Sequence, residues 1–93
     1  MIKVNEYFDG NVKSLAFDSS KGAATIGVMK AGEYVFGTST VEYMTVTSGA
    51  MEVKQPGETE WKAYQPFETF RVEKGVEFTV KVAGDTSYLC TYE

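Results

Sequence analysis

The sequence predicts an all-β fold, built either as a small barrel or as a sandwich. Roughly nine short stretches alternate apolar and polar residues with the period of two that is typical of half-buried strands. Turn-forming residues, chiefly Gly, Pro, Asp and Ser, separate these stretches at regular spacing. No stretch sustains the 3.6-residue apolar period of an amphipathic helix. We expect a single domain over residues 1–93, because this length suits one compact core and no repeat or linker divides it.

The first half of the chain contains four of the expected strands. Asp9 and Gly10 form a turn signal, and the preceding Tyr7 and Phe8 are expected to cover an edge of the core or to contact a partner subunit. A polar corner at 37–40 joins the last two strands of this half. The expected strands are residues 11–17, 23–30, 33–36 and 41–48.

The second half of the chain contains the clearest strand signal. Val76, Phe78, Val80 and Val82 alternate with Glu77, Thr79 and Lys81. Such alternation predicts one buried and one exposed face. The expected strands are residues 50–54, a short piece around 61–64, and residues 67–72, 76–82 and 87–92.

Composition excludes several classes of protein. A net charge of −4 and a pI near 4.8 argue against nucleic acid as the main partner. No apolar run is long enough to span a bilayer, and polar residues interrupt the amino terminus where a signal peptide would be apolar. The single cysteine, Cys90, cannot form an internal disulfide and is expected to be a small buried side chain. We therefore expect a cytoplasmic protein with neither nucleic acid nor membrane as partner.

The chain contains no histidine. Zinc, copper and non-haem iron sites use imidazole or several thiolates, so no such metal site is expected. Histidine-based triads and histidine general acids are excluded for the same reason. An oxygen-only site for a hard cation remains an alternative, although the sequence has no clustered carboxylates of the calcium-loop kind. We therefore expect no resident metal or other cofactor.

Glu42 is the first candidate for a functional side chain. On the strand 41–48 it shares a face with Met44 and Val46, which is the more apolar of the two faces. A carboxylate on a core face is costly unless it is paired. Glu42 is therefore either a functional carboxylate or the partner of a lysine or arginine inside the fold.

Two spacings are similar to those of cupin motifs. Glu42 stands seven residues before Gly49, as in the second half of the first cupin motif. In the second motif, Phe67 stands at the first glycine, Glu73 at the proline and Phe78 at the histidine ligand, while Gly75 keeps the turn glycine.

The chain as a whole closely resembles the small cupin-type pyrimidine/purine nucleoside phosphorylase family of bacteria. The resemblance extends from about Asn5 to Tyr92. The segments that carry it are Asn5–Phe8, Val12–Ser14, Gly27–Met29, Gly32–Tyr34, Glu42–Val46 with Ser48 and Gly49, and Ser87–Cys90. It implies a metal-free, cupin-like (jelly-roll) β-barrel that forms a homodimer. It also implies phosphorolysis of purine and pyrimidine nucleosides by inorganic phosphate, a co-substrate, to free base and alpha-D-ribose 1-phosphate.

Phosphorolysis needs phosphate ligands, stabilisation of an oxocarbenium-like sugar and a donor to the departing base. Glu42 is the candidate catalytic carboxylate, and Glu33 is a second carboxylate near the same corner. Arg71 is the only arginine, and with Lys13 it is a candidate phosphate ligand. Alternation places Arg71 on the face opposite the core, so instead of binding phosphate it could contact solvent or a dimer partner. Lys13 and Glu33 could likewise be solvated surface residues rather than site residues.

Hydroxyl and aromatic side chains complete the candidate substrate site. Thr38, Ser39 and Thr40 offer hydroxyls and backbone N–H groups to phosphate or ribose, unless they form only a polar turn. A further set of aromatic residues either stacks on the nucleobase or simply packs in the core. These residues are Tyr34, Phe36, Tyr88 and Tyr92.

Three other functions are compatible with the residue pattern alone. The main alternative is a non-catalytic module that binds a sugar, nucleotide or other small metabolite, because hydroxyls and one buried acid serve either purpose. A metal-dependent cupin oxygenase or isomerase is disfavoured by the missing histidines. The third of these functions is that of a purely structural dimer without a ligand.

Overall fold

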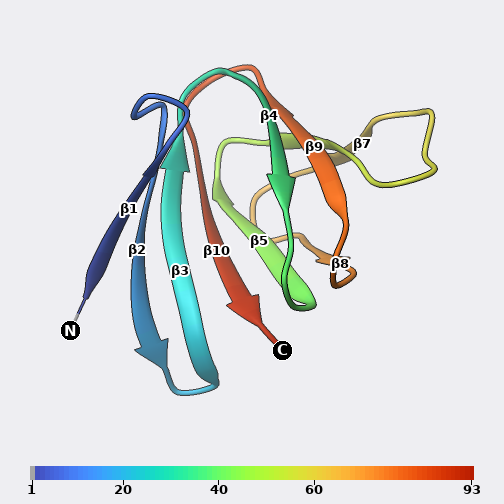
Figure 1. Cartoon of the computed structure of the whole chain (residues 1–93). Helices are drawn as coiled ribbons and strands as arrows, with labels where there is room; N and C mark the ends of the chain where they lie inside the picture. The colour runs from blue at the N-terminus through green and yellow to red at the C-terminus, as the bar shows by residue number, and fades with distance from the viewer. Residues whose placement is uncertain (1) are drawn as a thin grey trace.

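The computed structural model describes residues 2–93, which form ten β-strands (Figure 1). The strands are β1 (Lys3–Tyr7), β2 (Val12–Ser19), β3 (Gly22–Met29), β4 (Gly32–Gly37), β5 (Glu42–Ser48), β6 (Met51–Lys54), β7 (Lys62–Tyr64), β8 (Thr69–Val72), β9 (Glu77–Val82) and β10 (Thr86–Tyr92). No helix is assigned between residues 2 and 93, so no helix there is long and apolar enough to cross a membrane. The predicted all-β class is confirmed.

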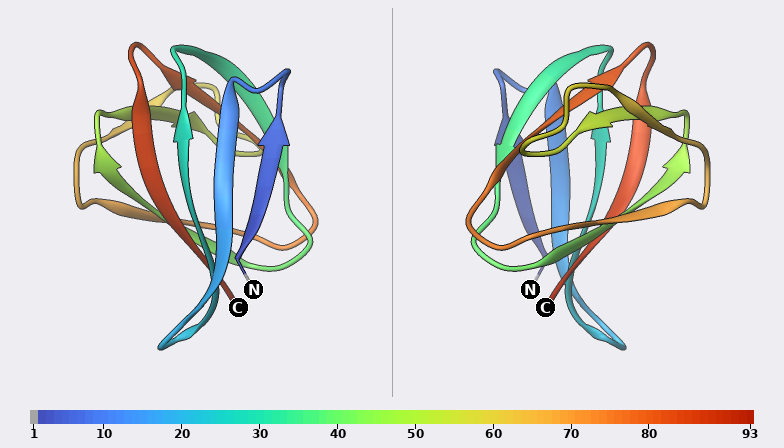
Figure 2. Two further views of the ribbon diagram at one scale, coloured as in Figure 1. Left: turned by 90° about the vertical axis from the view of Figure 1, so that its left-hand side faces the viewer. Right: turned by 90° about the vertical axis from the view of Figure 1, so that its right-hand side faces the viewer.

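The strands form two antiparallel sheets that face each other (Figure 2). One sheet has six strands in the order β1-β2-β3-β10-β5-β8, and the other has four in the order β4-β9-β6-β7. Over residues 2–93 the two sheets keep separate edge strands, so the closed barrel that we expected is not confirmed. The architecture is a two-sheet sandwich of the jelly-roll kind.

Strand alternation places the core between the sheets. On β9 the predicted inner residues Phe78, Val80 and Val82 are all buried, and on β5 Met44 and Val46 are buried as expected. The remaining core side chains come from every other strand except β1 and β7. The buried cluster consists of Val12, Met29, Tyr34, Met44, Val46, Met51, Val53, Phe70, Val72, Phe78, Val80, Val82, Tyr88 and Cys90.

The first strand was not predicted from the sequence. β1 pairs with β2 over its whole length, from Lys3 opposite Ala16 to Tyr7 opposite Val12. Its sequence mixes charged and apolar residues on both faces, so it lacks a clear alternation. After β1 the Phe8 ring packs against the four-stranded sheet, which confirms that this aromatic covers an edge of the core.

Phe67 occupies a turn conformation that favours glycine. Its φ is +71°, and its side chain is 80% exposed. The amide N–H of Phe67 donates to the carbonyl of Val46, which ties this turn to β5. The cupin pattern has glycine here, so the substitution by phenylalanine leaves local backbone strain rather than a changed fold.

Candidate active site

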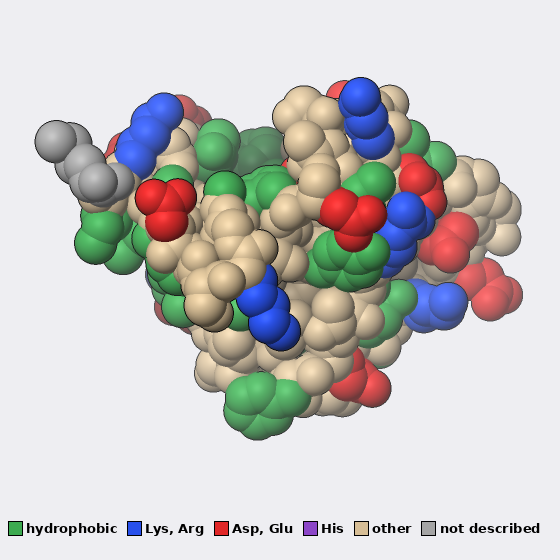
Figure 3. All heavy atoms as spheres, turned by 90° about the horizontal axis from the view of Figure 1, so that it is seen from below, with side chains coloured by type: hydrophobic (Ala, Val, Ile, Leu, Met, Phe, Trp, Pro, Cys, Tyr) green, Lys and Arg blue, Asp and Glu red, His purple; other side chains and the backbone are tan. Residues whose placement is uncertain are grey.

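A cavity of about 240 Å³ lies between the two sheets. Its inner wall is formed by β2, β3, β5 and β10, and it is covered by β4, β9, the end of β1 and the turn after β1. Seen from below, the surface of the molecule is hollowed between two lobes, and hydrophobic side chains are exposed in the hollow (Figure 3). None of the lysine, arginine, aspartate, asparagine or glutamine residues described in the structure lines this intersheet cavity.

Glu42 is the one carboxylate among the described residues that line the cavity. It begins β5, opposite Tyr92 of β10 and Val72 of β8. Burial raises the pKa of its carboxyl above the ordinary 4.5, and a hydrogen bond from the Cys90 thiol partly opposes this rise. The thiol sulfur lies 3.4 Å from Oε1 of Glu42. In the described part of the chain no lysine or arginine pairs with Glu42, so the core-facing placement is confirmed but the alternative of an internal ion pair is wrong.

Hydroxyl groups and a thiol surround the carboxylate. Thr25 of β3 and Tyr92 of β10 share a hydrogen bond of 2.9 Å between their hydroxyl oxygens. Burial raises the pKa of the Cys90 thiol to about 12, so the thiol is protonated at neutral pH and acts as a donor. Ser14 of β2 is buried on the same wall of the cavity. The cavity therefore offers neutral hydrogen-bonding groups around a single anion.

Tyr88 depends on a glycine directly beneath its ring. A Cβ atom added to Gly27 would lie 2.6 Å from Cζ and from the hydroxyl oxygen of Tyr88, because the two residues face each other across β3 and β10. Real side chains do not approach so closely, so the position requires glycine for this packing. Burial raises the pKa of the Tyr88 hydroxyl to about 12. Tyr88 thus presents a neutral phenol to the cavity.

Aromatic rings form much of the remaining lining. Phe8 and Phe36 pack edge to face with ring centroids 5.6 Å apart, and Phe36 stacks further on Phe78 at 5.7 Å. Phe8 has a φ of +54°, a strained value for an aromatic residue, and remains 42% exposed. Six aromatic residues line the cavity, namely Tyr7, Phe8, Phe36, Phe78, Tyr88 and Tyr92.

The structure brings together four of the predicted site residues, namely Glu42, Phe36, Tyr88 and Tyr92. Tyr34 instead packs in the core, where its hydroxyl donates to the carbonyl of Lys30 at 2.7 Å. The cavity lining includes neither Tyr34 nor the other predicted substrate-binding residues, namely Glu33, Thr38, Ser39 and Thr40. Their substrate-binding roles stay predictions.

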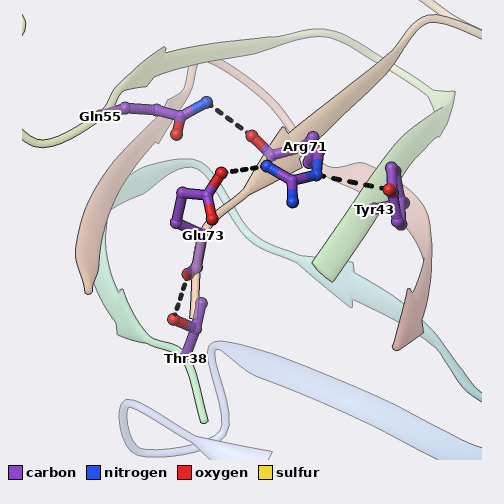
Figure 4. A network of polar contacts seen from close by, with 5 residues as sticks. All are labelled: Thr38, Tyr43, Gln55, Arg71 and Glu73. Carbon is purple, nitrogen blue, oxygen red and sulfur yellow. Dashed lines mark hydrogen bonds and ion pairs between the residues drawn. The ribbon is translucent and has the colours of Figure 1, made fainter. Parts of the chain in front are cut away.

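Arg71 and Thr38 belong to a surface network outside the cavity (Figure 4). The Arg71 guanidinium lies between the carboxylate of Glu73, with which it pairs, and the hydroxyl of Tyr43, to which its Nε donates at 3.3 Å. Thr38 donates its hydroxyl to the backbone carbonyl of Glu73 at 2.6 Å. Arg71 is exposed, as alternation on β8 predicted. Its role as a phosphate ligand stays a prediction that its position does not favour.

Lys13 also lies on an outer surface. Its Nζ is 3.4 Å from Oε1 of Glu6, and both side chains are largely exposed. Thr40 donates its hydroxyl to the neighbouring carbonyl of Val41, and Ser39 and Glu33 are exposed. The corner that the sequence singled out for its hydroxyls therefore lies beside the cavity rather than in it.

Several lining residues were not among the predicted site residues. Ser14, Thr25 and Cys90 come from three neighbouring strands, and Phe8 comes from the turn after β1. The alternation of residues 11–17 already placed Ser14 on the face shared with Val12. Only the strand order brings it near Glu42, and local sequence carries no signal for that order.

Comparisons with known proteins agree over nearly the whole chain. The family model described as pyrimidine/purine nucleoside phosphorylase matches residues 2–92. A protein of Pseudomonas aeruginosa (strain PAO1) with that name is 59% identical over 92 residues, which cover 99% of each chain. A protein of Psychromonas ingrahamii with the same name is 56% identical over 89 residues, covering 96% of this chain and 95% of its own.

Solved structures share the two-sheet architecture. A protein of unknown function from Vibrio parahaemolyticus superposes with a TM-score of 0.96 at 46% identity, covering 100% of this chain and 99% of the other. An RmlC-like cupin from Shewanella frigidimarina superposes with a TM-score of 0.73 at 17% identity, covering 98% of this chain and 82% of the other. The second likeness shows a cupin-like fold only.

Proposed function

Because this chain belongs to the pyrimidine/purine nucleoside phosphorylase family, we propose that it cleaves purine and pyrimidine nucleosides with inorganic phosphate in the intersheet cavity. The products are the free base and alpha-D-ribose 1-phosphate, so the reaction is a glycosyl transfer to phosphate. The observation that carries the placement is a half-buried carboxylate, Glu42, without a cationic partner among the described residues of that cavity.

Glu42 suits the charge that develops on the sugar. As the glycosidic bond stretches, the ribose acquires oxocarbenium-like positive charge. A carboxylate in a partly dehydrated cavity attracts that charge more strongly than one in water, since the local dielectric constant is lower. A lysine or arginine beside it would cancel the effect. The described lining supplies none, and in its ionised form Glu42 can also accept hydrogen bonds from ribose hydroxyls.

The aromatic lining suits recognition of both kinds of base. Ring faces such as those of Phe36 and Tyr88 pack against purines and pyrimidines alike, because every base has a π-face. A site that read the edge of one base would need fixed amide or charged donors. The described cavity offers neutral hydroxyls instead, so contacts with the base depend on shape and stacking.

The reaction as proposed needs no resident cofactor, because phosphate itself is the nucleophile. In support, residues 2–93 contain no group of three or more His, Cys, Asp or Glu side chains placed to hold a metal ion. Phosphate must lie beside the ribose to attack it, so the hydroxyls of Ser14 and Thr25, which line the cavity, are the ligands that this placement favours. Arg71 and Lys13, the ligands expected from the sequence, lie outside the cavity and are the alternative.

We also propose that the protein acts in the cytoplasm as a homodimer of single-domain subunits with cupin-barrel geometry. In support of pairing, an apolar row crosses the outer face of the six-stranded sheet, where Val4, Leu15, Ile26 and Leu89 are cross-strand neighbours. An apolar groove of about 560 Å³ lies over this face. The exposed pair Glu6–Lys13 beside it carries both charge signs, which suits contact with a second copy of the same face.

The dimer proposal is tested by light scattering coupled to gel filtration. Ile26→Glu places a charge in the apolar row and is expected to yield monomers. Thr69→Glu, on the β8 edge of the same sheet, is the matched control and is expected to leave the dimer intact. An oligomeric state that Ile26→Glu leaves unchanged would contradict this assignment of the interface.

The function is tested by measuring the release of free base from uridine, inosine, adenosine and guanosine, with and without inorganic phosphate. The proposal predicts release that requires phosphate, with ribose 1-phosphate formed in equal amount. Release without phosphate would instead indicate a hydrolase. No release from any nucleoside, with or without phosphate, would overturn the proposed activity.

A further inference from the structure

We propose that Cys90 is a positioning residue for Glu42: its thiol holds one carboxylate oxygen and thereby directs the other into the intersheet cavity. This inference rests on the function proposed above for Glu42. It assigns a task to a buried thiol that the phosphorolysis reaction itself does not use.

The strand register explains why Cys90 supplies this contact. Glu42 of β5 lies directly opposite Tyr92 of β10, and Cys90 is the inward-facing residue two positions before Tyr92. The Tyr92 hydroxyl is engaged with Thr25 at 2.9 Å. The diagonal neighbour Cys90 therefore becomes the donor to Glu42, with 3.4 Å between Sγ and Oε1.

Only one carboxylate oxygen is engaged in this way. The Cys90 thiol provides the one hydrogen bond that the described residues make to the Glu42 carboxylate, and it goes to Oε1. Every fully buried side-chain nitrogen or oxygen in residues 2–93 has a hydrogen-bond partner. Oε2 of Glu42 has none, so it is not fully buried, and it is accessible from the cavity that Glu42 lines. A carboxylate fixed at one oxygen and open at the other has a set direction for a ligand.

The thiol is suited to this task because it is a weak and neutral donor. Its pKa is raised to about 12 by burial, so it carries its proton throughout the neutral range. A cation at the same place would neutralise Glu42 and cancel its attraction for the sugar. A methyl group would leave the carboxylate without direction. A thiol orients the anion while leaving most of its charge available.

The groups that can influence the titration of Glu42 are few. From β10 the titratable groups that face it are Tyr88, Cys90 and Tyr92, and from β1 Tyr7 lines the same cavity. Its neighbour on β8 is the apolar Val72, and the described cavity-lining residues of β4 and β9 carry no titratable group. A change in the titration of Glu42 on replacing Cys90 is therefore attributable to the thiol.

The experiment compares Cys90→Ala, which removes the donor, with Cys90→Ser, which keeps one. The first readout is the titration of the Glu42 carboxyl carbon by NMR in the ligand-free protein. Loss of a donor to the anion is expected to raise the pKa of Glu42 in Cys90→Ala, and Cys90→Ser is expected to bring it back toward the wild-type value.

The second readout is the pH profile of kcat/KM. In Cys90→Ala the acid limb of this profile is expected to move to higher pH, so that kcat/KM at pH 5.5 falls by about threefold or more. In Cys90→Ser the acid limb is expected to return toward its wild-type position. If Cys90→Ala does not fold, Cys90→Val fills the same space without a donor and replaces it.

Three results would overturn the proposal. The first is a pKa of Glu42 in folded Cys90→Ala that equals the wild-type value. The second is a pKa of Glu42 in Cys90→Ala that is lower than the wild-type value. The third is a Cys90→Ser protein that matches Cys90→Ala in both readouts. The NMR titration needs no substrate. If no nucleoside is cleaved at all, the proposed function fails, while the inference about Cys90 is still decided.

Discussion

Two carboxylates, Glu42 and Glu73, lie in opposite surroundings. Glu73 is exposed and pairs with Arg71 on the outer surface, whereas Glu42 is half-buried between the sheets with a thiol as its one described partner. An exposed ion pair contributes about 0–1 kcal/mol to stability and can be lost without consequence. An unpaired, partly buried carboxylate lowers stability and persists where it serves a function. This contrast supports our proposal that the chemistry takes place in the cavity and not at the arginine.

Replacing Glu42 should have the largest effect. Glu42→Gln keeps the shape of the side chain but removes the charge that stabilises the sugar, so kcat is expected to fall by about 100-fold or more. The melting temperature should be unchanged or higher, since the amide carries no charge to dehydrate. The matched variant Glu73→Gln is expected to stay within about threefold of the wild type. Equal losses in both variants would erase the contrast between the two acids.

A methyl group under Tyr88 should have the next largest effect. Gly27→Ala would place its Cβ 2.6 Å from the Tyr88 ring, so the ring must move. We expect a loss of about 1–3 kcal/mol in the free energy of unfolding and of roughly tenfold in kcat/KM. Gly37→Ala is the control, because Gly37 lines the same cavity and a Cβ there meets nothing within 4 Å. Wild-type activity in Gly27→Ala would remove Tyr88 from the site.

Much of this contrast could be predicted from the sequence, because alternation alone assigns Glu42 to a buried face and Arg71 to an exposed one. Alternation does not say which inward side chains line a cavity and which pack together. Tyr34 and Phe36 share a face of β4, yet Tyr34 packs against its own turn while Phe36 reaches the cavity. Thr25 reaches the site only through the pairing of β3 with β10, which local sequence does not encode.

The two acids should also differ in how they link stability to pH. Because burial raises the pKa of Glu42 above 4.5 in the folded state, the native protein binds more protons than the unfolded chain between 4.5 and that raised value. Stability from this group is therefore lost as the pH rises through that window. Urea denaturation at a series of pH values should show Glu42→Gln gaining stability over the wild type from about pH 4 toward neutrality. A difference that does not change with pH would contradict the raised pKa.

The smallest effect should come from a strained residue on the outer surface. Phe67→Gly relieves a φ of +71° at a side chain that is 80% exposed. We expect a gain of about 0.5–1 kcal/mol in the free energy of unfolding, with no change in kcat/KM. The measurement is urea denaturation beside a steady-state assay. A loss of activity would show that the surface region takes part in catalysis and would weaken the comparison.

We propose that the nucleoside binds between the sheets, at Glu42. The most direct test is a crystal structure of the Glu42→Gln variant grown with inosine and inorganic phosphate. We expect the base to lie against Phe36 and Tyr88, with the ribose within hydrogen-bonding distance of residue 42. A nucleoside bound instead on the outer surface beside Arg71, with the intersheet cavity empty, would contradict it.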